Sequence, residues 1–316
     1  MTTREFAEFH AELRSVAGEL LAKDRTVEWP TLVDAGWTGL EVPEEFGGAG
    51  ASFAETAVIC EEMGRAATSS SYLGSAVLAV AVLNAVEPSD IRNRLLAEVA
   101  SGAVRVAVAL ESLDFVPDAE GTDCILVVAD GSVAVTNPSI TARPVLDETR
   151  RLAAVSAVKP SETLRFHGDP DAQVRKLHDR AATAIAADSL GLAEAMLAAT
   201  VSYAKVRHQF GQPIGSFQAV KHACADMLVQ TKVARQLVSA AVEAVVGGNL
   251  DGTPSMAKAY ACGAAVDVVG KAMQLHGGIG YTWESGIHVY LKRAALNRSL
   301  FGSPTAHRKA LAKRYR

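Results

Sequence analysis

Two short segments in the C-terminal half carry residues suited to binding a diphosphate. The first reads Arg-His-Gln-Phe-Gly-Gln-Pro-Ile-Gly-Ser-Phe-Gln and runs from Arg207 to Gln218. A guanidinium grips a pyrophosphate through two parallel hydrogen bonds, and the N-terminus of a following helix adds unpaired N–H groups. Gln209 and Gln218 offer amides to an adenine or ribose, and Phe210 offers an apolar surface. An isolated Arg-x-x-Phe-Gly run favours a helix-capping arginine and a core phenylalanine, but the complete run favours an anion site.

The second segment reads Gln-Leu-His-Gly-Gly-Ile-Gly-Tyr and runs from Gln274 to Tyr281. Glycines at a helix end can form a simple C-cap and tight turn. They also let the backbone approach a diphosphate that a Cβ would obstruct. Alone the run is a weak signal without the strand of a dinucleotide-binding turn, but its pairing with the first segment strengthens it. The predicted cofactor-binding residues are Arg207, Gln209, Phe210, Gln218, Gln274, Gly277 and Gly278, whereas we expect His276 to be structural.

Together these two segments resemble the flavin-gripping segments of the acyl-CoA dehydrogenase family, and the resemblance extends over nearly the whole chain. It implies an FAD cofactor, an acyl-CoA thioester substrate and α,β-desaturation. In that family a carboxylate removes the α-proton and the β-hydride passes to the flavin. The FAD lies across a subunit interface, with the ring on one subunit's β-domain and the pyrophosphate and adenine on the neighbour's two segments.

The sequence departs from the family pattern at the catalytic base. Where the family reads Tyr-Glu-Gly-Thr, this chain reads Leu-Phe-Gly-Ser, which places Phe301 at the position of the carboxylate. Some relatives carry the base on the helix after the first segment, and Ala234 occupies that neighbourhood here. A phenylalanine cannot accept a proton, so we expect no catalytic residue in this chain.

A second departure concerns the flavin-ring pocket. The family's Thr-Glu-Pro-x-x-Gly-Ser-Asp run corresponds here to Leu110-Glu111-Ser112-Leu113-Asp114, without the threonine, the proline or the glycine-serine pair. The β-domain is also short, and we expect its own ring pocket to be lost. Arg235 stands where family members often keep an arginine near the active site, and a solvated helix face is an equally weighted alternative.

With these two departures, the chain resembles the short, base-less subunit of heterotetrameric acyl-CoA dehydrogenases. The expected partners are a larger paralogous subunit in an α2β2 assembly, an acyl-CoA substrate and an electron-accepting flavoprotein. The partner would supply the ring pocket and the catalytic glutamate, and a sterol-derived substrate is suggested by analogy alone. Two alternatives remain open: a self-sufficient homo-oligomeric flavoenzyme with another base such as Glu111, and a non-catalytic scaffold.

The elements that must position these segments are mostly helical. Spacings of three and four residues predict helices over 4–24, from Trp29, over 53–67 and over a long alanine-rich stretch from 73 to 100. Helical periodicity returns from about 176, with helices over 182–206, 217–246 and 255–275, one beginning near 284–286, and one after Gly302. The 42–50 turn also resembles the family, where we expect a structural role.

Between the helical parts the composition changes to β-branched residues. Strands are predicted over 104–110, 124–129, 132–136, 152–158 and 163–166, with a hairpin at Asp130-Gly131. The fold class is therefore mainly α with a small β-domain, as in the acyl-CoA dehydrogenases. We divide the chain into an N-terminal helical domain (1–103), a reduced β-domain (104–167) and a C-terminal helical bundle (168–316).

Composition excludes several function classes. The formal charge of −4, from 31 Lys+Arg and 35 Asp+Glu, argues against a nucleic-acid-binding protein. The four cysteines stand far apart without ligand spacing, so we expect no metal site and a reducing, cytoplasmic location. The first residues do not resemble a signal peptide, and the apolar window from 73 to 86 is too short for a membrane span.

Overall fold

The computed structural model describes residues 3–156, 159–249 and 251–314, and these divide into two compact units. Unit 1 comprises residues 1–23, 58–68 and 182–316, and unit 2 comprises residues 24–57 and 69–181. The structure confirms the expected class, a mainly helical chain with a small β region between helical parts. The three-part division by sequence stays a prediction.

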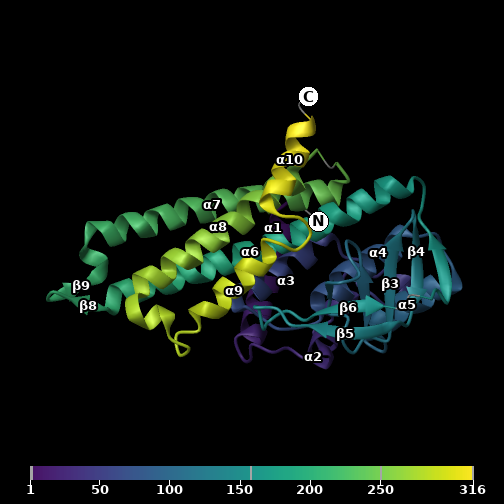
Figure 1. Cartoon of the computed structure of the whole chain (residues 1–316), viewed down its shortest axis with the longest axis horizontal. Coiled ribbons are helices and arrows are strands. Elements are labelled where there is room, and N and C mark those ends of the chain that lie inside the picture. Colours follow the sequence, from purple (N-terminus) through teal and green to yellow (C-terminus); the bar gives the residue numbers. More distant parts are fainter. Residues whose placement is uncertain (1–2, 157–158, 250, 315–316) are drawn as a thin grey trace. The chain divides into compact units, whose positions relative to one another are not determined.

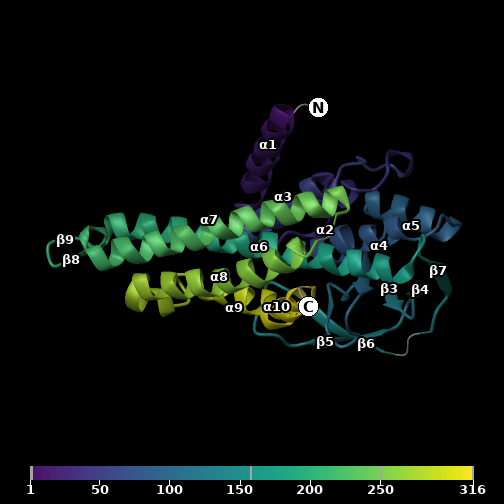
Figure 2. The ribbon, with the colours of Figure 1, turned by 90° about the horizontal axis from the view of Figure 1, so that it is seen from above.

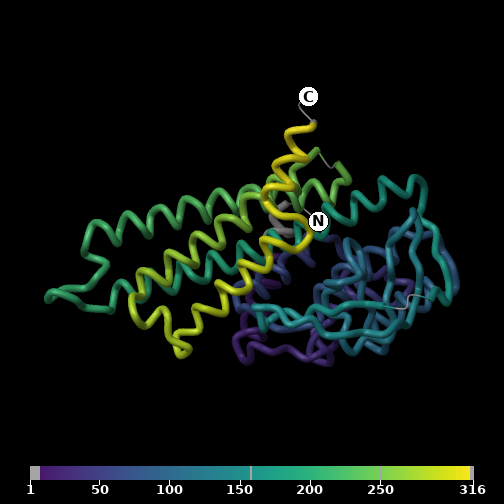
Figure 3. The backbone as a smooth tube through the Cα atoms, in the orientation of Figure 1, coloured from purple at the N-terminus to yellow at the C-terminus, as the bar shows by residue number. Residues whose placement is uncertain are grey.

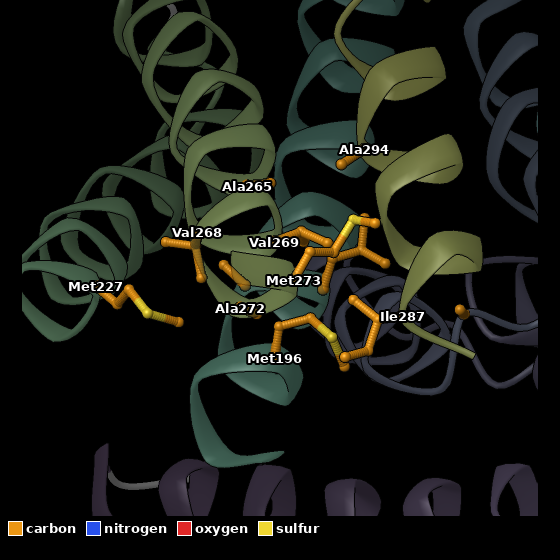
Figure 4. Packing of buried hydrophobic residues seen from close by; sticks show 12 residues of the cluster. Met196, Met227, Ala265, Val268, Val269, Ala272, Met273, Ile287 and Ala294 are labelled. Carbon is orange, nitrogen blue, oxygen red and sulfur yellow. The ribbon is translucent and has the colours of Figure 1, made fainter. Parts of the chain in front are cut away.

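Unit 1 is built around a helical bundle. Its helices are α6 (Pro170–Val206, from Ala182 onward), α7 (Gln218–Gly247), α8 (Thr253–His276), α9 (Ile287–Asn297) and α10 (Pro304–Arg314), together with α1 (Thr3–Leu21) and most of α3 (Phe53–Ala66). Helices α6 to α9 run alongside one another in two perpendicular views (Figures 1 and 2). Methionine, valine, isoleucine and alanine side chains of α6, α7, α8 and α9 fill the space between them, among them Met196, Met227, Val269, Met273 and Ile287 (Figure 4).

Helix α6 is longer than the sequence predicts, because it begins at Pro170 rather than Ala182. Proline is favoured in a first helical turn, and the Asp169 carboxylate accepts a hydrogen bond from the Asp171 N–H at 3.1 Å. The helix is long and apolar enough to cross a membrane by length and composition alone. However, 67% of its most apolar window is buried inside the protein, as expected for a core helix.

Helices α3 and α6 approach each other closely within unit 1 at two glycines. A Cβ on Gly64 would lie 1.9 Å from the Asp188 carbonyl oxygen, and one on Gly191 would lie 1.9 Å from the Glu61 carbonyl oxygen. Real Cβ atoms never approach backbone oxygens so closely, so both positions require glycine. The close approach places the charged side chains of both helices beside one another.

Unit 2 contains two small sheets. One has the order β1-β3-β4-β7, with β1 parallel to β3 and the other pairs antiparallel, and the second has the antiparallel order β2-β6-β5. The strands are β1 (Val106–Ala109), β2 (Val116–Pro117), β3 (Cys124–Ala129), β4 (Ser132–Thr136), β5 (Ser139–Arg143), β6 (Leu152–Ser156) and β7 (Glu162–Arg165). Asp130 and Gly131 both have positive φ, which confirms the predicted hairpin. The short strands β2 and β5 are not predicted, and residues 157–158 of the expected strand 152–158 lie outside the described residues.

The predicted helix from 73 to 100 is wrong as a single element. It is divided into a π-helical turn η3 (Leu73–Ala79), α4 (Val80–Ala85) and α5 (Asp90–Ala100). Val86 is extended, and the break follows at Glu87-Pro88 because a proline disfavours helical backbone in the residue before it. Ser89 then caps α5 by accepting a hydrogen bond from the Arg92 N–H.

The remaining elements of unit 2 are α2 (Trp29–Asp34) and the 3-10 turns η1 (Trp37–Gly39) and η2 (Glu44–Phe46). Gly48 follows η2 and lies against the chain before it, since a Cβ there would be 2.0 Å from the Val42 carbonyl oxygen. The close approach explains the glycine in the 42–50 turn. It supports the structural role expected for this turn.

Candidate functional site

The Arg207–Gln218 segment forms a compact hairpin between α6 and α7. Strands β8 (His208–Gln209) and β9 (Gln212–Pro213) pair across a two-residue loop, in which Phe210 and Gly211 both have positive φ. The Ile214 N–H donates to the Arg207 carbonyl at 2.7 Å, and the 3-10 turn η4 (Ile214–Ser216) leads into α7. The helix before the segment ends at Val206, as predicted, and Gln218 is the first residue of α7.

The predicted ligand-contacting side chains of this hairpin lie open to solvent. Phe210 is 92% exposed, and its ring forms a T-shaped contact with the Phe217 ring at a centroid distance of 6.2 Å. Arg207, Gln209 and Gln218 are also exposed. Among the described residues no carboxylate forms an ion pair with Arg207, which leaves its guanidinium available to an external anion.

The second segment forms the end of α8 and the 3-10 turn η5 (Gly277–Tyr281). Gly277 has φ +63 and ψ −144, a conformation that L side chains rarely adopt. Gly278 has ordinary backbone angles and nothing within 4 Å of a built Cβ, so no neighbour in its own chain accounts for the missing side chain. An open backbone at Gly278 fits close approach by a group from outside the chain, as a diphosphate requires.

The two segments lie toward the same end of the bundle. Figure 3 shows the chain reversing there between α6 and α7 and again between α8 and α9. Tyr203 of α6 stacks on His276 of α8, with ring centroids 4.3 Å apart and planes inclined by 21°. The Tyr203 hydroxyl also donates to the His276 carbonyl at 3.3 Å. The contact joins the last turns of α6 and α8, which lead into the two segments.

Phe301 lies in a tight turn between α9 and α10 and is 6% exposed. It has φ +52, and Gly302 has φ +91. The Lys258 ammonium group of α8 donates to the carbonyls of Asn297 and Gly302, both at 2.9 Å. His307 donates from Nε2 to the Phe301 carbonyl at 2.8 Å, and its Nδ1 lies 3.0 Å from the Ser255 hydroxyl.

A buried polar network in unit 1 continues from this turn. Asn297 donates its amide to Asp188 at 2.6 Å, and Arg293 forms a bidentate ion pair with the same carboxylate at 3.0 and 2.5 Å. Lys258 and Asn297 are completely buried.

Cys262 of α8 is also buried in unit 1, and its thiol lies 3.3 Å from the Ser189 hydroxyl. Burial raises the pKa of this thiol, so Cys262 is neutral.

Family models match both ends of the chain: the acyl-CoA dehydrogenase N-terminal domain over residues 1–103 and the C-terminal domain over residues 172–315. The chain belongs to the acyl-CoA dehydrogenase family. The family's cofactor is FAD, which supplies a two-electron acceptor when bound. The exposed arginine and the open glycine turn at the end of the bundle fit a diphosphate of this kind.

Named relatives support this assignment. The acyl-CoA dehydrogenase IpdE2 of Mycolicibacterium smegmatis is 37% identical over 284 residues, which cover 87% of this chain and 84% of the relative. The solved structure of the Tcur3481-Tcur3483 steroid ACAD G363A variant has a TM-score of 0.87 and 27% identity, with 97% of both chains covered. The ChsE4-ChsE5 complex from Mycobacterium tuberculosis has a TM-score of 0.87 and 23% identity, with 100% of this chain and 98% of that chain covered.

Arg235, the arginine that family members often keep near the active site, belongs to an ion-pair network inside unit 1. It contacts Glu61 at 2.5 and 2.6 Å and Glu194 at 2.6 Å. Arg65 also pairs with both of these carboxylates and with Glu62. Because the Arg235 guanidinium itself pairs with Glu61 and Glu194, the alternative that Arg235 lies on a solvated helix face is wrong. The neighbouring Ala234 is buried and carries no proton acceptor.

The two glutamates of this network that have shifted pKa values differ in direction. Burial raises the pKa of Glu62, and the neighbouring Glu61 adds to the increase. Burial would also raise the pKa of Glu194, but hydrogen bonds and charges from Arg235 and Arg65 lower it below its usual value. Glu194 is therefore held as a carboxylate by two arginines, which suits a structural ion pair.

Glu111 is the alternative base named from the sequence, and Asp114 and Glu284 are two further carboxylates that could be tested in that role. In unit 2, Glu111 is partly exposed, 4.0 Å from His178, and Asp114 pairs with Arg143 at 3.3 Å on the surface. In unit 1, a hydrogen bond from its own backbone lowers the pKa of the exposed Glu284, and Thr282 contributes further. All four cysteines are free thiols, and among the described residues no group of three or more His, Cys, Asp or Glu is placed to hold a metal.

Proposed function

We propose that this chain is the smaller, base-less subunit of a heteromeric, FAD-dependent acyl-CoA dehydrogenase. In this proposal Arg207, Gly277 and Gly278 bind the FAD pyrophosphate, and Gln209, Phe210, Gln218 and Gln274 bind the ribose and adenine. A larger paralogous subunit supplies the flavin-ring pocket and the catalytic glutamate in an α2β2 assembly. An electron-accepting flavoprotein reoxidises the enzyme.

One contrast within unit 1 carries the proposal. The bundle end presents an exposed arginine and an open glycine turn to solvent, whereas the base position holds a buried phenylalanine. The chain thus retains groups that can bind a cofactor and lacks the group that must take the substrate's proton. A partner that supplies the carboxylate reconciles the two observations.

The substrate proposal rests on the names of relatives. One solved relative at 27% identity is a steroid ACAD, and its name joins two gene products. We propose a bulky, sterol-derived acyl-CoA as the substrate of the assembled enzyme.

We also propose a cytoplasmic location, because a reducing compartment suits the four free thiols of this chain. The three-part division at 1–103, 104–167 and 168–316 remains our proposal for how the chain is organised.

The test is to express the chain alone and together with a full-length paralogue, and to record the visible spectrum of each purified sample. We expect the chain alone to bind little or no flavin, because its β region lacks the family's ring-binding run. The co-purified complex should be yellow, with one flavin for each pair of subunits. A stoichiometric flavin spectrum from the chain alone would contradict the proposal.

The self-sufficient enzyme remains the second candidate, favoured by one specific observation. Glu111 follows strand β1 at the place of the family's ring-binding run and lies 4.0 Å from His178. Activity of the chain alone that disappears in the Glu111→Gln variant would support this candidate. Flavin-free assembly with the paralogue, without any effect on turnover, would instead support a scaffold.

A further inference from the structure

Tyr203 and His276 are outside the set of residues that we propose to contact FAD, yet they join the two segments that carry that set. Tyr203 lies one helical turn before Arg207, whose N–H donates to the Tyr203 carbonyl at 2.9 Å. His276 immediately precedes Gly277. The separation between the arginine and the glycine turn therefore depends on how these two rings meet.

The contact is fixed on both sides. His276 Nδ1 lies 2.8 Å from the Ala272 carbonyl, and since a carbonyl only accepts, Nδ1 must carry the proton. This bond holds the imidazole plane, and the tyrosine ring stacks on it at 4.3 Å. The Tyr203 hydroxyl then binds the His276 carbonyl, which lies at a helix C-terminus where carbonyls lack intrahelical partners.

We propose that Tyr203 is a positioning residue for cofactor binding. Its stack on His276 and its hydroxyl hold the end of α6 in register with the Gly277–Gly278 turn, so that both reach one diphosphate. The inference rests on the proposed function, in which these two segments bind FAD. A rigid, preformed site binds more tightly because less freedom is lost when the ligand arrives.

The experiment compares four variants of the co-expressed complex. Tyr203→Phe retains the stack and loses the hydroxyl, and Tyr203→Leu loses both. Tyr290→Phe is the matched control, because its hydroxyl donates to the Arg65 carbonyl at 3.1 Å elsewhere in the bundle. Arg207→Ala tests the proposed function itself. The measurements are the FAD dissociation constant, the melting temperature of the flavin-free protein, and amide hydrogen exchange over residues 274–281.

We expect FAD affinity to fall about fivefold in Tyr203→Phe, because one hydrogen bond is lost. In Tyr203→Leu we expect a fall of about fifty- to a hundredfold, because the hydrogen bond and the aromatic stack are both lost. Exchange over 274–281 should accelerate in Tyr203→Leu even without flavin. Tyr290→Phe should lower the melting temperature and leave FAD affinity unchanged.

The two possible failures are distinguishable. If Arg207→Ala leaves FAD affinity unchanged, the proposed function fails. If Arg207→Ala weakens FAD binding but Tyr203→Leu does not, or changes affinity no more than Tyr290→Phe, the positioning role fails. Unchanged exchange over 274–281 in Tyr203→Leu would overturn it as well, even in a sample that binds no flavin.

Discussion

The Nε2 atom of His307 lies 2.8 Å from the carbonyl oxygen of Phe301, the residue that we align with the family's usual base position. The bond ties α10 to the turn before it, while Lys258 holds the same turn from α8. Phe301 is therefore part of a turn that is stabilised by hydrogen bonds from Lys258 and His307. Phe301 thus packs within this chain, which agrees with our proposal that another subunit supplies the catalytic carboxylate.

The contact between His307 and Phe301 predicts a pH dependence of stability. Burial lowers the pKa of His307, although its bond to the Phe301 carbonyl partly opposes the shift. The unfolded chain therefore binds the proton more readily than the folded one. The free energy of unfolding should be highest above the ordinary histidine pKa of about 6.5, and should fall as the pH decreases from there to the folded pKa.

The variant His307→Gln isolates this contribution. Its amide can still donate to the Phe301 carbonyl but does not titrate, so unfolding free energies measured from pH 8 to pH 5 should decline less steeply than in the wild type. At pH 8, where both side chains are neutral, the two proteins should differ little. Parallel curves for wild type and variant would show that His307 has no part in the pH dependence.

Lys258 should be among the most sensitive positions for stability. It is completely buried and donates to two backbone carbonyls. We expect Lys258→Met to lower the free energy of unfolding by about 3–5 kcal/mol, because the charge-assisted hydrogen bonds to both carbonyls are lost inside the protein. Urea denaturation measures the change. Lys271→Met, on the exposed face of the same helix, should stay within about 0.5 kcal/mol of the wild type.

Local signals in the sequence predict much of the fold. Asp130-Gly131 predicts its hairpin because both residues tolerate positive φ, and Gly248 ends α7 in that same conformation. Pro88 also indicates the break between α4 and α5. We nevertheless predict one continuous helix there, because the alanine-rich periodicity continues on both sides of the proline. In each case the decisive interaction lies within a few residues.

The remaining features depend on partners distant in the sequence. The sequence around Lys258 does not predict its burial or its hydrogen bonds. Both depend on α9 and the turn after it, which supply the two carbonyls. Arg235 suggests either a solvated face or an active-site cation until α3 and α6 supply Glu61 and Glu194. Both segments of the candidate site are predictable as motifs, but the Tyr203–His276 contact that joins them is not.

The approach of α3 to α6 predicts a strict glycine requirement. A methyl group on Gly64 would collide with backbone rather than with a movable side chain, so the helices would have to separate. We expect Gly64→Ala to lower the free energy of unfolding by more than about 2 kcal/mol. Gly263→Ala, in the middle of α8 with nothing within 4 Å, should instead raise it by about 0.5–1 kcal/mol. Similar effects of the two substitutions on denaturation would show that the helices do not meet so closely.

The missing base yields a prediction about turnover of the assembled complex. If the partner holds the catalytic glutamate, no carboxylate of this chain is essential. Replacing Glu111, Asp114 or Glu284 by its amide should leave appreciable activity, whereas removing the partner's glutamate should abolish it, since general bases contribute on the order of 10²–10⁴-fold.

Phe301→Glu extends the same test to the base position itself. The new carboxylate would replace a side chain that is 6% exposed, so we expect a lower melting temperature. It should not create a second working site, because we expect the Leu110–Asp114 run to provide no pocket for the flavin ring. Steady-state rates of the complex, measured with flavin content, decide between the models. A loss greater than a hundredfold from any one amide variant, with flavin retained, would place the base in this chain. New activity of Phe301→Glu without the partner would instead show that this chain has a ring pocket of its own.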